Sequence, residues 1–171
     1  RSEHTNELFE NLKISKDQSY RENLNRYDVI KINIQEFLSM TGTVEEMLEM
    51  LKNYLISDFK EAYPKILLRD EKNLIQVMKD VFSYTKCPFV ILIDEWDCLF
   101  REYKQDKEEQ KKYLDFLRAW LKDKDYVALA YMTGILPIKK YGTQSALTDF
   151  YEYTMLEPGP LAEFVGFTEQ E

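Results

Sequence analysis

The chain has 171 residues, 44% of them apolar and 32% charged, with five glycines and five prolines, which excludes collagen-like, low-complexity and disordered classes. This length predicts a single domain that buries about 70% of the surface of its unfolded chain without disulfides. A formal net charge of −8 argues against a broad nucleic-acid footprint, and a single histidine, His4, argues against Ser/His/Asp and Cys/His catalysis and His-rich zinc sites.

The first 35 residues predict a helix followed by a strand. Ser15 with Gln18 matches the capping box that satisfies the free amides at a helix start. Residues 27–34 are rich in β-branched and other apolar side chains, which is typical of a strand.

Two helices are predicted next. Thr43 with Glu46 matches a second capping box, and apolar residues at spacings of three and four follow it. This pattern predicts one helix that ends before Pro64. A second apolar stripe predicts a helix over residues 71–84.

The remaining elements are a strand, a helix and a strand. Residues 89–93 and 126–132 are nearly continuous apolar runs, the pattern of strands covered on both faces of a parallel sheet. Between them, residues 107–121 predict a helix, and the charge run 104–112 is interpreted as a solvated helix face or loop.

The alternation of strands and helices predicts an α/β fold, a three-layer sandwich with a parallel sheet and right-handed crossovers. The first domain is expected to span residues 1–157, and residues 158–171 are expected to begin a following helical segment. The two cysteines, Cys87 and Cys98, lack metal-site spacing and indicate reduced thiols in a cytoplasmic protein. No apolar run approaches the roughly 20 residues of a membrane span.

The strongest chemical signal is the pair Asp94 and Glu95 at the end of the second strand. Ligands of open parallel sheets bind beyond the carboxyl ends of the strands, where this pair would emerge. The pair suits nucleotide hydrolysis, with Asp94 holding Mg²⁺ through water and Glu95 orienting or deprotonating the attacking water. The alternative is that both acids cap the next helix. Asp97 stands three residues after Asp94, which excludes an Asp-x-Asp phosphatase motif.

The third strand, expected next to the strand that ends at Asp94, ends at Thr133, followed by Gly134. Its hydroxyl is a candidate for contact with a γ-phosphate or the attacking water, and the alternative is a turn residue. Lys139 and Lys140 follow and are interpreted as surface lysines rather than phosphate ligands. No Gly-x-x-x-x-Gly-Lys-[Ser/Thr] phosphate loop is present in the chain.

Together these residues resemble the AAA-ATPase-like domain family of bacterial and archaeal proteins, whose members are often fused to a PD-(D/E)XK nuclease-like domain. The resemblance covers nearly the whole chain and rests on the order and spacing of the segments 8–14, 27–30, 92–97, 132–138 and 165–169. It implies a P-loop-type ATPase in which Asp94 and Glu95 form the Walker B motif and Thr133 is the sensor. ATP and Mg²⁺ are the implied cofactors of the parent protein.

In the family the Walker A loop lies just upstream of the segment 8–14, so the chain looks like a member cut after its first strand and phosphate loop. We expect the missing strand to lie beside the strand that ends at Asp94, so that its loss exposes two apolar edges. The fragment alone would then be nearly inactive, and either marginally stable or self-associating, unless the sheet closes without that strand.

Two other functions stay open at this point. A degenerate NTPase fold could serve as a non-catalytic interaction or regulatory module, which the absent loop favours. A role in nucleic-acid processing follows only from the nuclease-like partner domain of the family, and the acidic composition argues against direct nucleic-acid binding by these residues.

Overall fold

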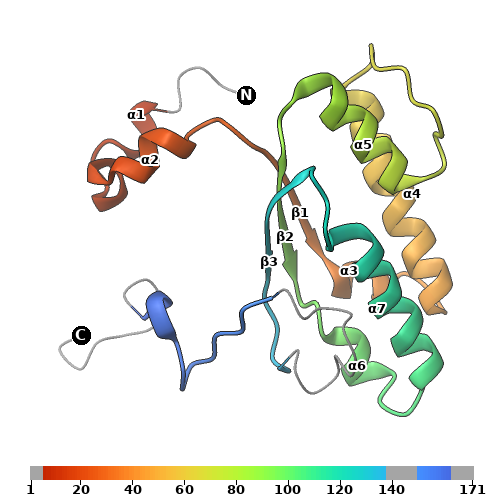
Figure 1. Ribbon diagram of the computed structural model, residues 1–171. Coiled ribbons are helices and arrows are strands. Elements are labelled where there is room, and N and C mark those ends of the chain that lie inside the picture. The colour runs from red at the N-terminus through yellow and green to blue at the C-terminus, as the bar shows by residue number, and fades with distance from the viewer. Residues whose placement is uncertain (1–5, 138–149, 163–171) are drawn as a thin grey trace.

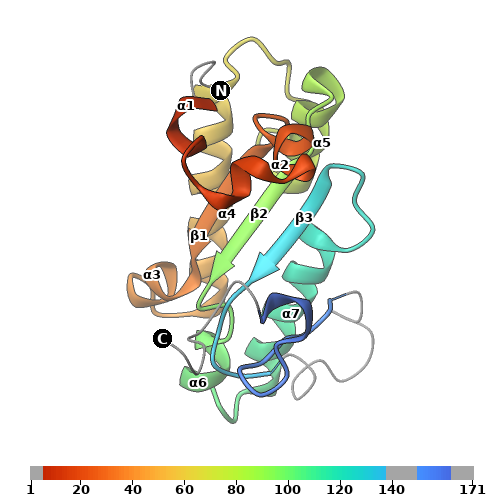
Figure 2. The same cartoon turned by 90° about the vertical axis from the view of Figure 1, so that its left-hand side faces the viewer.

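The computed structural model describes residues 6–137 and 150–162. Its centre is a parallel three-stranded sheet in the order β1-β2-β3, made of β1 (Asp28–Asn33), β2 (Phe89–Asp94) and β3 (Val127–Met132) (Figures 1 and 2). The three predicted strands are therefore confirmed to within one residue at each end. The α/β class with a parallel sheet is confirmed as well.

Helices α3 to α7 lie on one side of the sheet, and α1 and α2 lie on the other side, toward the ends where the strands begin (Figure 1). The helical elements are α1 (Asn6–Phe9), η1 (Lys13–Lys16), α2 (Gln18–Asn23), α3 (Ile34–Ser39), α4 (Val44–Ala62), α5 (Leu74–Thr85), α6 (Cys98–Glu102), α7 (Lys107–Leu121) and η2 (Gly159–Leu161).

The predicted start of α4 is confirmed, whereas the predicted cap at Ser15 is wrong. The hydroxyl of Thr43 accepts a hydrogen bond from the amide of Glu46 at 3.2 Å, as an N-cap should. Helix α2 begins later than expected because Asp17 caps it, accepting from the amide of Ser19 at 2.8 Å. The Ser15 hydroxyl donates instead to carbonyl oxygens that precede it in the chain.

The other two predicted helices differ in accuracy. Helix α7 has the predicted bounds, and most of its first charged residues are exposed. Helix α5 starts at Leu74, three residues later than predicted, because Asn73 accepts a hydrogen bond from the amide of Gln76 and caps it there.

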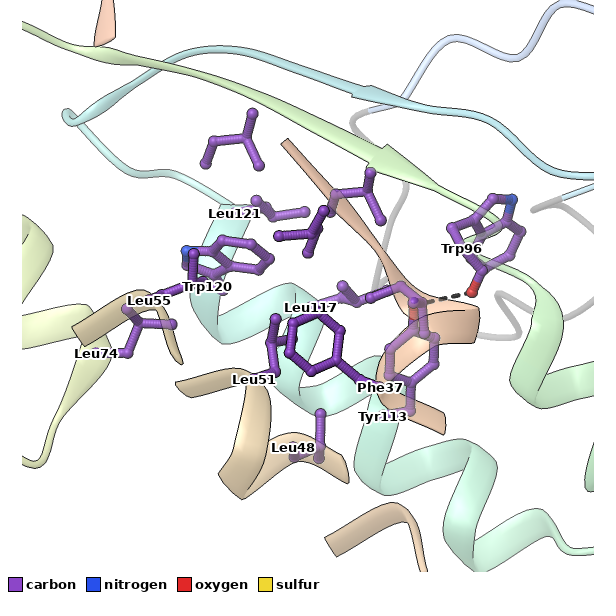
Figure 3. Packing of buried hydrophobic residues seen from close by; sticks show 14 of the residues in the cluster. Phe37, Leu48, Leu51, Leu55, Leu74, Trp96, Tyr113, Leu117, Trp120 and Leu121 are labelled. Carbon is purple, nitrogen blue, oxygen red and sulfur yellow. Dashed lines mark hydrogen bonds between the residues drawn. The ribbon is translucent and has the colours of Figure 1, made fainter. Parts of the chain in front are cut away.

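The hydrophobic core fills the space between the sheet and helices α3 to α7 (Figure 3). Trp120 and Tyr113 of α7 are fully buried at its centre, and the Trp120 Nε1 donates to the sulfur of Met78 at 2.9 Å. The Tyr113 hydroxyl donates to the carbonyl oxygen of Trp96 at 2.8 Å. This last bond ties α7 to the loop that follows β2.

The opposite face of the sheet is open over much of the described chain. Val29, Leu129 and Tyr131 on this face are 63%, 52% and 44% exposed. Along β2, buried residues alternate with half-buried ones, so the strand is packed more tightly on one face than on the other. In residues 6–137 and 150–162, the helices that pack along the strands form one layer on one face of the sheet. The sheet and this helical layer are two of the three layers expected for the sandwich.

Of the two outcomes expected for the sheet, the exposed edge on the Asp94 strand is wrong. Strand β2 pairs with β1 on one edge and with β3 on the other, so no edge of the Asp94 strand is open. The free edges in the described residues are the outer edges of β1 and β3. Among the described residues the sheet therefore closes without a further strand beside β2, which is the alternative stated for the sheet.

Three further expectations concern the chain as a whole. The boundary between residues 157 and 158 stays a prediction, and the helical segment expected around residues 165–169 lies outside the described residues. Over the described part of the chain, no helix is both long enough and apolar enough to cross a membrane.

Candidate functional site

The carboxyl ends of β2 and β3 bring Asp94 and Thr133 together. The Thr133 hydroxyl donates to Oδ1 of Asp94 at 2.5 Å, and the amide of Glu95 donates to the same oxygen at 3.0 Å. The pairing continues past the strand ends, because the Thr133 amide donates to the Ile93 carbonyl and the Trp96 amide donates to the Thr133 carbonyl. Two loops far apart in sequence are thus fixed against each other.

Glu95 has a backbone conformation that is rare for its residue type. Its φ is 52°, in the left-handed region, where a non-glycine residue costs of order 1–3 kcal/mol. Such strain persists where the surrounding contacts impose it, and it is common at functional sites. Here the Thr133 contacts on one side and the start of α6 on the other hold this turn.

The Glu95 carboxylate contacts Arg101 of α6. One of its carboxylate oxygens, Oε2, pairs with the Arg101 guanidinium in a short ion pair. Both side chains are about one third exposed, at 34% for Glu95 and 31% for Arg101. The two carboxylates of the predicted pair therefore have different side-chain partners, Thr133 for Asp94 and Arg101 for Glu95.

Arg101 also faces Asp97, whose side chain is fully buried. The Arg101 Nε lies 3.5 Å from Oδ2 of Asp97, an ion-pair contact without hydrogen-bond geometry. Burial opposes the charge of Arg101, but the attraction of Asp97 and Glu95 outweighs it and raises the pKa of the guanidinium above its usual value. Oδ2 of Asp97 accepts a hydrogen bond from the Leu136 amide at 2.9 Å, in the loop after β3.

Gly134 allows this close approach of the two loops. A Cβ built on Gly134 would lie 2.4 Å from Oδ1 of Asp97 and 2.7 Å from Cδ1 of Trp96. Oδ1 is buried and has no hydrogen-bond partner within the residues that the structure describes. A side chain at position 134 would therefore displace either the buried carboxylate or the buried indole.

The helix-capping alternative for the two acids is not supported by these contacts. Helix α6 has Asp97 as its N-cap residue, and the Asp97 side chain makes no capping hydrogen bond. The Asp94 carboxylate accepts from the Glu95 amide, which precedes α6, and the described contact of the Glu95 carboxylate is with Arg101.

The donor set suits a magnesium ion held through water. Asp94 is exposed, and its Oδ1 takes the two hydrogen bonds described above, while its Oδ2 takes none from the described residues. One free carboxylate oxygen beside a hydroxyl fits an ion that keeps several of its waters and binds only one or two carboxylates. Within residues 6–137 and 150–162, no group of three or more metal-ligating side chains is present.

The site itself is open to solvent. Two hollows of about 330 Å³ each lie near the end of the sheet where the strands begin, and neither is lined by Asp94, Glu95 or Thr133. Lys139 and Lys140 lie outside the described residues. Sequence reasoning missed Arg101 and the contacts of Asp97, although their spacing of four residues on a helix start is a recognised ion-pair signal.

The open parallel sheet, with a carboxylate and a hydroxyl joined at its strand tips, defines an α/β domain. The chain belongs to the AAA-ATPase_like family, described as "Predicted AAA-ATPase", whose family model matches residues 1–144. No curated protein and no solved structure matches the chain. The family name suggests a predicted AAA-type ATPase.

Proposed function

We propose that the chain carries the magnesium-binding and water-activating part of an ATP-hydrolysing site. The observation that carries the proposal is the joining of Asp94 and Thr133 at the tips of two adjacent strands, directly beside the strained Glu95. A site of this composition can hold a hydrated cation and a water molecule next to a phosphate.

Each residue has a distinct role in the proposal. The hydrogen bonds from Thr133 and from the Glu95 amide orient the Asp94 carboxylate and leave Oδ2, which has no partner among the described residues, for a water of the Mg²⁺ shell. The bound Mg²⁺ would supply positive charge to the phosphates. Glu95 accepts the proton of the attacking water, and the Thr133 hydroxyl contacts the γ-phosphate or that water.

The proposal also requires a phosphate-binding loop. None of the five glycines belongs to a Gly-x-x-x-x-Gly-Lys-[Ser/Thr] motif, so the amides that cradle phosphates must come from a segment other than these 171 residues. We accordingly treat residues 1–157 as a partial AAA-ATPase-like core and residues 158–171 as the start of a following segment.

Phosphate release from ATP by the complete natural protein tests the proposal. We expect Asp94→Asn to raise the Mg²⁺ concentration needed for half-maximal turnover. Thr133→Val should lower kcat by 10-fold or more, whereas Thr133→Ser should retain most of the wild-type kcat because the hydroxyl stays. Glu102→Gln is the matched control, since Glu102 is exposed and makes none of the described contacts. Equal turnover in all four variants would overturn the assignment of the site.

A second candidate function is a non-catalytic interaction module, favoured by the open face of the sheet with its exposed Val29, Leu129 and Tyr131. This function predicts that Mg²⁺ and ATP leave the melting temperature of the complete protein unchanged. A rise in that temperature with ATP concentration would favour the ATPase, because a ligand that binds the folded state stabilises it by mass action.

A further inference from the structure

The ion pair between Glu95 and Arg101 assigns a role to a residue that the proposed function does not use. A general base must present its carboxylate to the attacking water in a fixed orientation. Glu95 lies in a loop and is one third exposed, so its own packing does not immobilise the carboxylate. The Arg101 guanidinium contacts Oε2 and leaves Oε1 without a partner among the described residues.

Arg101 is itself held by a group that cannot move freely. The Asp97 carboxylate is fully buried, and the Leu136 amide and the Arg101 Nε both face its Oδ2. The backbone reinforces the arrangement, because the Arg101 amide donates to the Asp97 carbonyl at 3.3 Å in the first turn of α6. The chain of contacts thus runs from the buried Asp97, through Arg101, to the partly exposed carboxylate of Glu95.

We propose that Arg101 is a positioning residue for Glu95, anchored by Asp97 and holding the Glu95 carboxylate with one oxygen free to accept a proton. This inference rests on the proposed function. It also explains why an arginine suits the position, since the planar guanidinium can face two carboxylates at once, whereas the single ammonium group of a lysine cannot reproduce that fork.

Steady-state ATP hydrolysis by the complete natural protein gives the first test. We expect Arg101→Gln to lower kcat by about 10- to 100-fold, the usual cost of losing a group that orients a catalytic side chain, with KM changed less than twofold. The kcat of Arg101→Lys should lie between that of the wild type and that of Arg101→Gln. Arg118→Gln is the control and should match the wild type, since Arg118 is exposed on α7 and makes none of the described side-chain contacts.

Rescue separates positioning from a purely structural role. Because Arg101 is 31% exposed, added guanidinium ion at millimolar concentration can reach the vacated place in Arg101→Ala and should restore part of kcat. The same ion should leave the wild type and the Arg118→Gln variant unchanged. A loss of kcat in Arg101→Ala that guanidinium does not restore at all would count against the role.

A second readout needs no nucleotide. The Nε–H signal of Arg101 in the NMR spectrum of the full protein should shift in Glu95→Gln and in Asp97→Asn, and should stay in place in Glu102→Gln. An unchanged Arg101 signal in Glu95→Gln would overturn the proposal.

The outcomes also distinguish a failure of the proposed ATPase function from a failure of the role assigned to Arg101. A wild type without turnover would overturn the proposed function and the role of Arg101 together. Turnover in the wild type that persists unchanged in Arg101→Gln would overturn only the role of Arg101.

Discussion

Replacing Gly134 by alanine should loosen the contact between the loops after β2 and β3. The added Cβ would lie 2.4 Å from the buried Oδ1 of Asp97 and 2.7 Å from the buried Trp96 ring, whereas ordinary contacts begin at 3.4 Å. The neighbours cannot yield easily, because Asp97 is 0% and Trp96 is 3% exposed. The loop after β3 must therefore move outward, which lengthens the hydrogen bond from Leu136 to Asp97.

The loss in the free energy of unfolding of Gly134→Ala follows from two opposing effects. Overpacking of a buried contact costs about 1–3 kcal/mol, and the reduced entropy of the unfolded chain returns about 0.4–1 kcal/mol. A net loss of about 1–2 kcal/mol in the free energy of unfolding lowers the melting temperature by about 2–8 °C for a chain of this size. Urea unfolding followed by tryptophan fluorescence measures it, since Trp96 lies at the contact.

Gly42→Ala is the matched control for this experiment. The nearest atom to a Cβ on Gly42 is Oε2 of Glu46 at 3.4 Å, an ordinary contact, so this variant should stay within about 0.5 kcal/mol of the wild type. If Gly134→Ala unfolds at the same urea concentration as Gly42→Ala, the reasoning about the close approach of the two loops is refuted.

Three further predictions concern stability and reactivity. Tyr113→Phe should cost about 1–3 kcal/mol in urea unfolding, because a buried carbonyl loses its donor, while Tyr84→Phe, at an exposed position, should cost almost nothing. Burial alone would raise the pKa of Asp80, but hydrogen bonds from Arg69 and Gln76 lower this pKa below its usual value. The Asp80 carboxylate should therefore contribute its full stabilisation above the unfolded pKa of about 3.9, and this stabilisation should be lost as the pH falls through the lower folded pKa. Asp80→Asn should therefore reduce stability more at pH 7 than at pH 2, and a pH-independent effect would contradict this interpretation. Burial raises the pKa of Cys98 to about 12, so the native protein should not react at Cys98 with a thiol reagent at pH 8, and labelling within minutes before denaturant is added would be inconsistent with this environment.

The sequence predicted the sheet well because its strands are short, strongly apolar runs. It predicted the caps less well, since Asp17 competes with Ser15 for the start of α2 and the Asp17 carboxylate is the group that accepts from a helix amide. Helix α3 was missed because it follows β1 without a loop. Asn33 is both the last residue of the strand and the cap of the helix, so no polar turn marks the change.

The approach of Asp94 and Thr133 followed from the expectation that their two strands are parallel neighbours, and the structure confirms this geometry. Their chemical roles stay predictions. The pairing of Glu95 with Arg101 could not be predicted, because it depends on a left-handed backbone turn at a glutamate, which neither periodicity nor spacing reveals.

The most direct test of the account compares ATP binding and ATP hydrolysis by the complete natural protein with those of its Glu95→Gln variant. The substitution keeps the size of the side chain and one acceptor oxygen but removes its charge and its ability to accept a proton. The account predicts a Kd for Mg²⁺-ATP within about threefold of the wild-type value and a loss of turnover of about 10²- to 10⁴-fold, the usual contribution of a general base. Undiminished turnover in Glu95→Gln would contradict the account, as would a wild type that neither binds nor hydrolyses ATP.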